Sequence, residues 1–316
     1  MSTVQTIQSD YRTLTEACGV LDRSERGKLA LRGAEAKSFL QGQVSNDVES
    51  LSPGSGCYAA FLTPKGKMLG DLRILDTGEE LLLDTERLAL QGLFNMIRRF
   101  SIGYQVELEK RTMESGLLSL IGPDAVRVAG VESLADVEHA HAMISLGGVP
   151  ARAIRTDVGV DLLCVAGDTA ELLGAVSAAG AVPVSEEAAE CLRIEHGRPR
   201  YGIDLDDTVI PQEAGLNARA VSFSKGCYVG QETVARLHYR GKPNRHLRGL
   251  RLSDEVGRGE ELEFEGRGVG RVTSTAVSPR FGAIGLGFVR RTAPPGSTVS
   301  VGPAGVAAEV VELPFA

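Results

Sequence analysis

The eight residues from Lys225 to Glu232 hold the side chains that are best suited to chemistry. In order they are Lys225, Gly226, Cys227, Tyr228, Val229, Gly230, Gln231 and Glu232. A thiol reacts as its thiolate, which is favoured by partly exposed, electropositive surroundings. Lys225 and the N-terminus of a helix expected to begin near Tyr228 would both favour a thiolate at Cys227. The pattern also fits a turn at Gly226 followed by a small buried hydrophobe, because most free cysteines are simply buried.

Two carboxylates, Glu195 and Asp71, form the second group of candidates. Glu195 ends an apolar-periodic helix just before a glycine-containing turn. A buried carboxylate can accept two hydrogen bonds at once from a donor-rich ligand in an otherwise apolar pocket. The alternative is a surface ion pair between Glu195 and Arg193 or Arg198. Asp71 lies in an expected strand, where it could also face solvent.

Composition argues against several classes of function. The chain has 316 residues, 43% hydrophobic and 24% charged, which is ordinary for a globular protein of two or more domains. Five widely spaced cysteines without a CxxC pair and five histidines without an HExxH motif argue against a disulfide framework or a metal site. No phosphate-binding glycine loop follows a strand into a helix. The lack of an apolar leader or of a run of roughly 20 apolar residues predicts a cytoplasmic protein.

Charge is distributed unevenly along the chain. The net charge is −7, yet the segment from Arg219 to Arg251 has eight basic residues against Glu232, which leaves a local balance of +7. This asymmetry predicts an anionic partner there, such as a polyglutamate tail, a phosphate-bearing ligand, RNA or an acidic protein. A solvated basic face is the alternative. RNA is the weaker choice, because aromatic residues are only 5% of the chain and Trp is absent.

Two groups of strands and helices must position these residues. The first is expected to contain a short helix and turn over 16–27, strands over 28–32, 58–62, 68–75 and 80–84, and helices over 34–41 and 87–99. The second is expected to contain strands over 106–110, 117–121, 151–155 and 161–165 and helices over 123–129, 168–179 and 185–196. This mixture predicts an α+β core over 1–244 with subdomains of about 1–103 and 104–244.

The pattern changes near residue 245, where helical periodicity stops. Five short, glycine-punctuated strands are expected over 247–252, 268–275, 283–288, 298–301 and 306–311. Strands at such spacing predict a small antiparallel β-barrel over 245–316.

Two adjoining stretches between Glu190 and Leu250 are long and specific. They read ECLRIEHGRPRYGIDL and VIPQEAGLNARAVSFSKGCYVGQETVARLHYRGKPNRHLRGL. They resemble the folate-binding YgfZ family, the bacterial relatives of mitochondrial IBA57, within the superfamily of the glycine-cleavage T-protein (aminomethyltransferase). Looser matches lie in order on both sides: DRSERGKLALRGAEAKSFLQGQVSNDV, FLTPKGKMLGDLRIL, GVGRVTSTAVSP and GLGFVRR. The resemblance implies a T-protein-like, folate-binding core of two similar α/β subdomains followed by a β-barrel.

The resemblance also implies a ligand, tetrahydrofolate or a one-carbon derivative, in a central channel. Glu195 would hold the pterin, and Asp71 would lie near folate N10. The other implied folate contacts are Asn46, Tyr201, Gln212 and Arg236, and the guanidinium fork of Arg236 suits the carboxylates of a glutamate tail. The pair Asn46-Asp47 fits a routine turn or cap equally well. Aminomethyltransferases have an Asp-Asp pair where this chain has Gly70-Asp71, which weighs against glycine-cleavage activity.

Cys227 separates this chain from T-proteins, which have an acidic residue at that position. The thiol could attack a carbon unit, join a transient disulfide or ligate iron from a cluster. The resemblance implies an accessory protein for iron–sulfur cluster assembly or repair, with client or assembly proteins as partners and links to tRNA modification. Folate-dependent aminomethyl transfer is the alternative activity. A module that binds RNA or protein through the basic segment is a third, and direct nucleic-acid binding is not expected.

Overall fold

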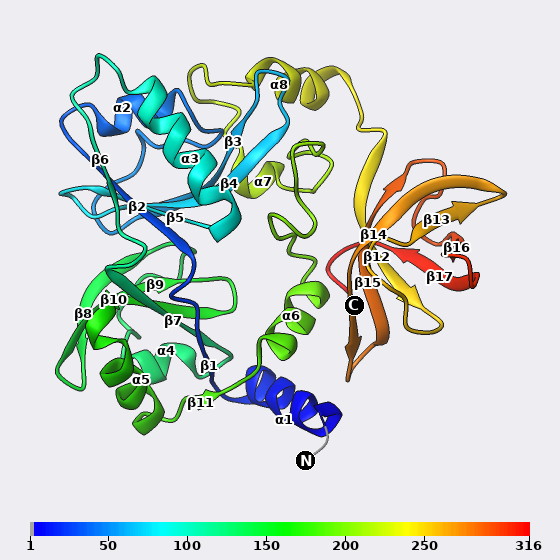
Figure 1. The fold of residues 1–316 in the computed structure, drawn as a ribbon, viewed down its shortest axis with the longest axis horizontal. Helices are drawn as coiled ribbons and strands as arrows, with labels where there is room; N and C mark the ends of the chain where they lie inside the picture. Colours follow the sequence, from blue (N-terminus) through cyan, green and yellow to red (C-terminus); the bar gives the residue numbers. More distant parts are fainter. Residues whose placement is uncertain (1–2) are drawn as a thin grey trace.

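The first half of the core is built on a five-stranded antiparallel sheet, which lies at the upper left of Figure 1. The structure is a computed structural model and describes residues 3–316. The strands run in the order β3 (Gly56–Leu62), β4 (Met68–Asp76), β5 (Leu81–Thr85), β2 (Gly27–Arg32) and β6 (Glu107–Lys110). Helices α2 (Ala36–Gln41) and α3 (Arg87–Phe100) cover one face. Helix α3 buries Ala89, Leu90, Leu93 and Ile97, which recur at helical spacing.

The other face of this sheet carries the charged side chains of the site. Side chains alternate along a strand, so Asp71 and Arg73 of β4 lie opposite Leu72 and Ile74, which pack in the core under α2 and α3. Asp84 of β5 is the direct cross-strand partner of Arg73. Strand pairing therefore brings a carboxylate and a guanidinium together on the face that meets the second sheet.

A six-stranded sheet, mainly green in Figure 1, forms the other half of the core. Its order is β11 (Val182–Pro183), β1 (Gly19–Asp22), β7 (Ser115–Ile121), β10 (Gly159–Val165), β9 (Val149–Arg155) and β8 (His141–Leu146). All neighbours are antiparallel except β1 and β11. Helices α4 (Ala125–Ala129) and α5 (Thr169–Ala178), the latter entered through a 3-10 turn (Ala166–Asp168), cover its apolar face. Strand β8 was not predicted, because His141–Leu146 is only half-buried and has no clear alternation.

The two halves of the core exchange elements. Strand β1, near the N-terminus, pairs with β7 in the second sheet, whereas β6, after residue 104, pairs with β2 in the first. Sheet membership therefore does not follow the expected division at 103/104. Strand pairing depends on distant partners, which local periodicity does not reveal.

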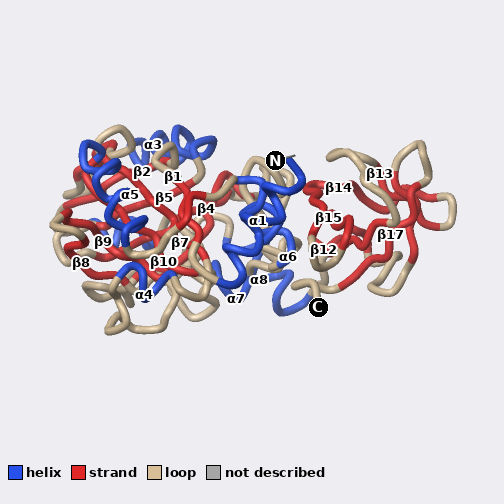
Figure 2. Tube along the Cα trace, turned by 90° about the horizontal axis from the view of Figure 1, so that it is seen from below, coloured by secondary structure: helices blue, strands red, loops and turns tan. Residues whose placement is uncertain are grey.

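Two helices join the core to the barrel. Helix α1 (Thr3–Glu16) packs against α6 (Glu186–Glu195), and Figure 2 shows both between the core and the barrel. The predicted short helix over 16–27 is wrong: the helix ends at Glu16, and β1 and the start of β2 occupy that range. A largely irregular segment with α7 (Asn217–Ala220) and α8 (Gln231–Arg240) then leads to the barrel.

The barrel is closed by six antiparallel strands. They are β12 (Arg245–Leu252), β13 (Glu261–Phe264), β14 (Arg267–Ser278), β15 (Gly282–Arg290), β16 (Thr298–Val301) and β17 (Val306–Val311). Five of the six were predicted; β13 was missed because only Leu262 of its four residues is buried. The predicted fold class, a T-protein-like α+β core followed by an antiparallel barrel, is confirmed.

Candidate functional site

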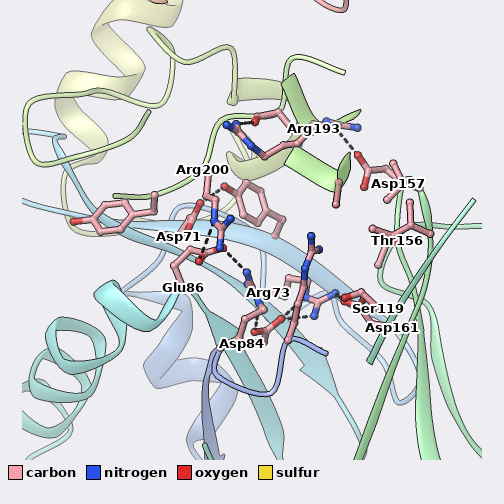
Figure 3. A pocket seen from close by; sticks show the side chains of 18 of the residues that line it. Asp71, Arg73, Asp84, Glu86, Ser119, Thr156, Asp157, Asp161, Arg193 and Arg200 are labelled. Atoms are coloured by element: carbon pink, nitrogen blue, oxygen red, sulfur yellow. Dashed lines mark hydrogen bonds and ion pairs between the residues drawn. The ribbon is translucent and has the colours of Figure 1, made fainter. Parts of the chain in front are cut away.

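A cavity of about 240 Å³ lies between the two sheets and helix α6 (Figure 3). Asp71 and Arg73 from β4 and Asp84 from β5 line one side, and Ser119 from β7 and Asp161 from β10 line the other. Loops, α6 and α7 add further lining residues, among them Glu138, His139, Asp157, Glu190, Arg193, Arg198, Arg200, Tyr201 and Arg219. A second hollow, toward the barrel, shares Asp157, His196 and Arg198 with this cavity.

Most charged side chains around the cavity are paired with one another. Arg73 bonds Asp84 in its own sheet and Asp161 in the other, with 2.6 Å between its Nη1 and Asp161 Oδ2 (Figure 3). Arg26 joins the same group through Asp84 at 2.9 Å and through Glu86. One charge network therefore ties the facing walls together.

Asp71 differs from Asp84 and Asp161, the other buried carboxylates of the cavity wall, because its partner is a neutral phenol. Tyr58 Oη donates a hydrogen bond of 2.5 Å to Asp71 Oδ2. Burial raises the pKa of Asp71 to about 6, and the Glu86 carboxylate adds to this against the opposing effect of Tyr58. A carboxyl group with such a pKa can accept and release a proton near neutral pH.

Gly70 points away from the cavity. A Cβ at this position would lie 2.4 Å from Cε1 of Phe61 and 2.9 Å from Cβ of Ala89, inside the layer under α3. A carboxylate at position 70 would therefore be buried among apolar side chains rather than beside Asp71. The Gly70-Asp71 sequence therefore removes no acid from the cavity wall and does not weigh against aminomethyl transfer.

Glu195 lies outside the cavity, at the junction of α1, α6 and the barrel. It is 4% exposed and accepts hydrogen bonds from Tyr11 Oη at 2.9 Å and Ser278 Oγ at 2.5 Å. The Cys191 thiol also approaches it, at 3.7 Å. The pterin contact predicted for Glu195 has no support from this placement. Glu186 and Glu190, on the same helix, are the α6 carboxylates that line the cavity.

We expect Glu195→Ala to lower the free energy of unfolding by about 2 kcal/mol, because it leaves two buried hydroxyls without their acceptor. Affinity for a ligand of the cavity should stay within about twofold of the wild-type value, since the site is separate. Denaturant unfolding and calorimetry measure the two effects. Glu190→Ala is the matched control and should weaken ligand binding instead. A large loss of affinity in Glu195→Ala, with unchanged stability, would restore the predicted pterin contact.

Lys225 is buried and binds backbone carbonyl oxygens. Its ammonium donates hydrogen bonds to three carbonyl oxygens, those of Gln41, Val44 at 2.7 Å and Asn46 at 2.9 Å. Burial lowers the pKa of Lys225 to about 8. All three donors of this lysine are used to hold the turn after α2, so the expected activation of Cys227 by Lys225 gains no support.

Cys227 is the exposed one of the five free cysteines. Helix α8 begins at Gln231, four residues after this thiol, rather than near Tyr228 as expected. Burial raises the pKa of the Cys18 thiol to about 11 and those of Cys57 and Cys191 to about 12. Cys227 is therefore the thiol that a partner molecule could reach most easily.

The other predicted folate contacts are scattered. Tyr201 lines the cavity, as does Asp71. Asn46 instead links its segment to β3 and α7, because its Nδ2 donates to the carbonyl oxygens of Tyr58 and Arg219. Gln212 lies elsewhere, with its Nε2 3.5 Å from the Leu237 carbonyl oxygen. Arg236 is an exposed residue of α8 that pairs with Glu232.

The basic segment does not form one basic face. Arg219, Arg245 and Arg248 pair with Glu138, Glu213 and Glu312, and Lys225 is buried. The exposed cations are confined to α8 and the residues that follow it, namely Arg236, Arg240 and Lys242. The predicted anionic partner would meet a smaller surface than the charge count indicated.

Glu138, His139 and Arg219 are among the lining residues that were not predicted from the sequence. Glu138 and His139 come from the loop before β8, and Arg219 comes from α7. No role was assigned to His139 from the sequence, and it is 6% exposed in the structure. Its one sequence signal was a histidine beside an acid between two strands, which is too common to indicate a site.

Neither a metal centre nor a membrane span was found in the described residues. Residues 3–316 contain no group of three or more His, Cys, Asp or Glu side chains arranged to hold a metal ion. Within the same range, no helix has the length and apolar character needed to cross a bilayer.

Comparisons with known proteins cover nearly the whole chain. Residues 1–225 match the model of the GCVT N-terminal domain, and residues 245–316 match the glycine cleavage T-protein C-terminal barrel domain. An aminomethyltransferase of Geobacillus kaustophilus is 32% identical, over 98% of this chain and 90% of its own length. An Arabidopsis thaliana protein named "Putative transferase At1g60990, chloroplastic" is 30% identical, over 94% of this chain and 71% of its own.

A solved structure supports the fold. The glycine cleavage system aminomethyltransferase T from Bartonella henselae superposes with a TM-score of 0.86, covering 98% of this chain and 89% of its own. Its sequence identity is 22%, so the likeness is one of fold.

Proposed function

The chain belongs to the glycine cleavage T-protein family, and from this premise we propose that its central cavity binds tetrahydrofolate or a one-carbon derivative. Members of this family bind these molecules. The observation that carries the proposal is Asp71, a buried acid with a raised pKa on the wall of a cavity between the two sheets. When bound, the folate would supply nitrogen atoms that can carry a one-carbon unit.

The residues present fit such a ligand. The volume of about 240 Å³ is below the roughly 300–1,000 Å³ of pockets that enclose a whole drug-sized molecule, so the cavity suits a ring system whose tail extends outward. The half-buried ring of Tyr201 offers an aromatic surface, and two buried polar atoms of the lining residues, His139 Nδ1 and Arg219 Nε, have no hydrogen-bond partner. Asp71 would hold or accept a proton beside the reacting nitrogen.

We further propose that the protein serves iron–sulfur cluster assembly or repair. The support is the Lys225–Glu232 motif, which resembles the YgfZ family, and the exposed thiol of Cys227 within it. In this proposal the folate site and the thiol act together. Cys227 would meet an assembly or client protein at the surface that leads to α8.

Aminomethyl transfer is the second candidate function. Two observations favour it: several relatives are named aminomethyltransferases, and Asp71 keeps its place in the cavity although position 70 is glycine. In that case Asp71 alone would serve the transfer, and Cys227 would be dispensable.

Calorimetric titration with tetrahydrofolate under reducing conditions tests the shared part of both proposals. We expect binding to the wild type and at least a roughly tenfold loss in Tyr201→Ala, which removes the aromatic surface of the cavity. Tyr239→Ala is the matched control, because Tyr239 is 67% exposed on α8, and it should bind normally. Undetectable binding to the wild type would refute the folate site.

Two assays then separate the candidate functions. In a cluster-dependent enzyme assay, Cys227→Ser should lose the supporting activity if the iron–sulfur role holds. Direct measurement of methylenetetrahydrofolate formed from an aminomethyl-lipoyl carrier should give no product in that case. Product formed at equal rates by the wild type and Cys227→Ser would instead favour aminomethyl transfer.

A further inference from the structure

Three aromatic rings meet at the surface beside the last turn of α8. The ring of Phe223 stacks on that of His238, with 3.8 Å between the centroids and 16° between the ring planes. Tyr239 meets both rings edge-on, with its centroid 6.3 Å from that of Phe223 and 4.8 Å from that of His238. His238 is exposed, and Tyr239 is 67% exposed. This ring cluster (Phe223, His238 and Tyr239) is therefore already assembled and partly open to solvent.

Exposed cations lie around the ring cluster, namely Lys65, Arg236, Arg240 and Lys242. Three of them belong to α8 or directly follow it, and the stretch from Arg236 to Lys242 contains no acid. Lys65 joins them because the β3–β4 turn packs on α8, where a Cβ on Gly66 would lie 2.9 Å from Cβ of Thr233. Figure 1 shows this turn beside α8. Among the described residues, only Arg236 of the four forms an ion pair, with Glu232, so the surface favours an anionic partner.

The combination of rings and cations favours single-stranded nucleic acid as that partner. Unpaired bases stack on exposed aromatic rings while nearby cations bind the phosphates, whereas the paired bases of a duplex have no free face. A stable protein interface instead needs an apolar core. Among the described residues from 223 to 242, the exposed large apolar side chains are limited to Tyr239. An acidic protein would therefore find cations here but little apolar surface to bury.

The low aromatic content of the chain does not exclude such a site. Aromatic residues are 5% of the chain, which argues against a long stacking platform. A site for about one or two bases needs only the rings that meet beside α8. Folding brings these rings together, and composition does not reveal that arrangement.

We propose that the ring cluster and the four cations around it bind single-stranded nucleic acid. The exposed rings of His238 and Tyr239 stack on bases, and the cations bind the phosphates. Among the described residues that line the cavity, none belongs to α8, so this site is separate from the proposed folate site. The inference goes beyond the proposed function and does not depend on it.

The test is fluorescence anisotropy of the full chain with labelled single-stranded RNA and DNA of the same mixed sequence. We expect at least one strand to bind, with a slope of log affinity against log salt of about −3, because each of the four cations contributes about −0.7. Tyr239→Ala should weaken binding at least roughly tenfold by removing a stacking ring. Arg240→Gln/Lys242→Gln should make the slope shallower by about 1.4.

Two control variants match these in the type of side chain removed. Phe100→Ala removes another exposed ring next to a guanidinium, since Arg99 lies 5.5 Å from the centroid of the 48% exposed Phe100 ring. Arg267→Gln/Arg271→Gln removes two exposed cations of the barrel strand β14. Both should bind nucleic acid within about twofold of the wild-type affinity. All four variants change exposed side chains and should keep the wild-type unfolding midpoint.

The proposal would be overturned by no binding of either strand at low salt, by unchanged affinity in Tyr239→Ala, or by equally tight binding of a polyglutamate peptide. The last result would identify an acidic protein segment as the partner. Tetrahydrofolate titration of Tyr239→Ala measures the other site separately. Normal folate binding with weakened nucleic-acid binding in this variant supports two separate sites, whereas loss of both would overturn their separation.

Discussion

Replacing Arg73 by methionine is expected to lower the free energy of unfolding by about 3–5 kcal/mol. Arg73 is the cation that joins Asp84 of the first sheet to Asp161 of the second, and all three side chains are about nine-tenths buried. Removing it leaves Asp161 as an unpaired buried charge. The free-energy cost of that charge exceeds the stabilisation that the ion pair itself provides. Thermal and denaturant unfolding of Arg73→Met should show the loss directly.

Two variants test this explanation. Arg236→Met removes an arginine from an exposed ion pair of α8 and should change stability by less than about 0.5 kcal/mol. The double variant Arg73→Met/Asp161→Leu removes the stranded charge and should recover much of the loss. If the double variant is less stable than Arg73→Met alone, the penalty comes from lost packing and not from the uncompensated carboxylate.

Asp71→Asn is expected to stabilise the protein at neutral pH. The pKa of Asp71 is about 6 in the folded state against 3.8 for the ordinary group, so the folded state binds the proton more tightly than the unfolded state. The ionised carboxylate therefore costs stability above pH 6, by roughly 3 kcal/mol at about 1.36 kcal/mol per pKa unit. That cost disappears as the pH falls from 6 to 4. The stabilisation by Asp71→Asn should therefore be largest above pH 6 and should disappear as the pH falls from 6 to 4. Folate-dependent activity should be lost in this variant.

Asp84→Asn, on the neighbouring strand, is expected to change the stability of the protein in the opposite direction. Burial opposes ionisation of Asp84, but Arg26 and Arg73 outweigh it and lower its pKa to about 2. A lowered pKa means that the charged form stabilises the fold at neutral pH, and that this stabilisation is lost only as the pH falls through 2. Asp84→Asn should therefore destabilise the protein at pH 7. Stabilisation by both substitutions would show that the charge network contributes nothing.

Local sequence signals were sufficient for much of the fold. The barrel strands at Thr298–Val301 and Val306–Val311 were predicted at their observed bounds, and helix α3 within one residue, because alternation and helical spacing are local properties. The sheets that β1 and β6 join were not predictable in this way. Both strands are short, and the identity of their partners depends on tertiary packing.

The site was predicted in part for the same reason. Asp71 and Tyr201 were found through motifs on or next to regular elements. Glu195 was predicted to contact the pterin and lies outside the cavity, since sequence spacing alone did not show whether its face of α6 meets the cavity or the barrel. His139 comes from a loop and Arg219 from α7, far apart in the chain, and both line the cavity only in the folded protein.

The exchange of β1 and β6 between the two sheets also constrains how this protein can be made. When the first hundred residues have left the ribosome, the first sheet still lacks β6 and β1 has no sheet to join. Neither half can fold as an independent unit, because each sheet includes a strand from the other half of the chain. The non-local pairings of β1 with β7 and of β2 with β6 make the core a slow, late-forming structure during synthesis. A chain stalled or cleaved between the halves would leave two incomplete sheets with open edges, which are targets for aggregation and degradation.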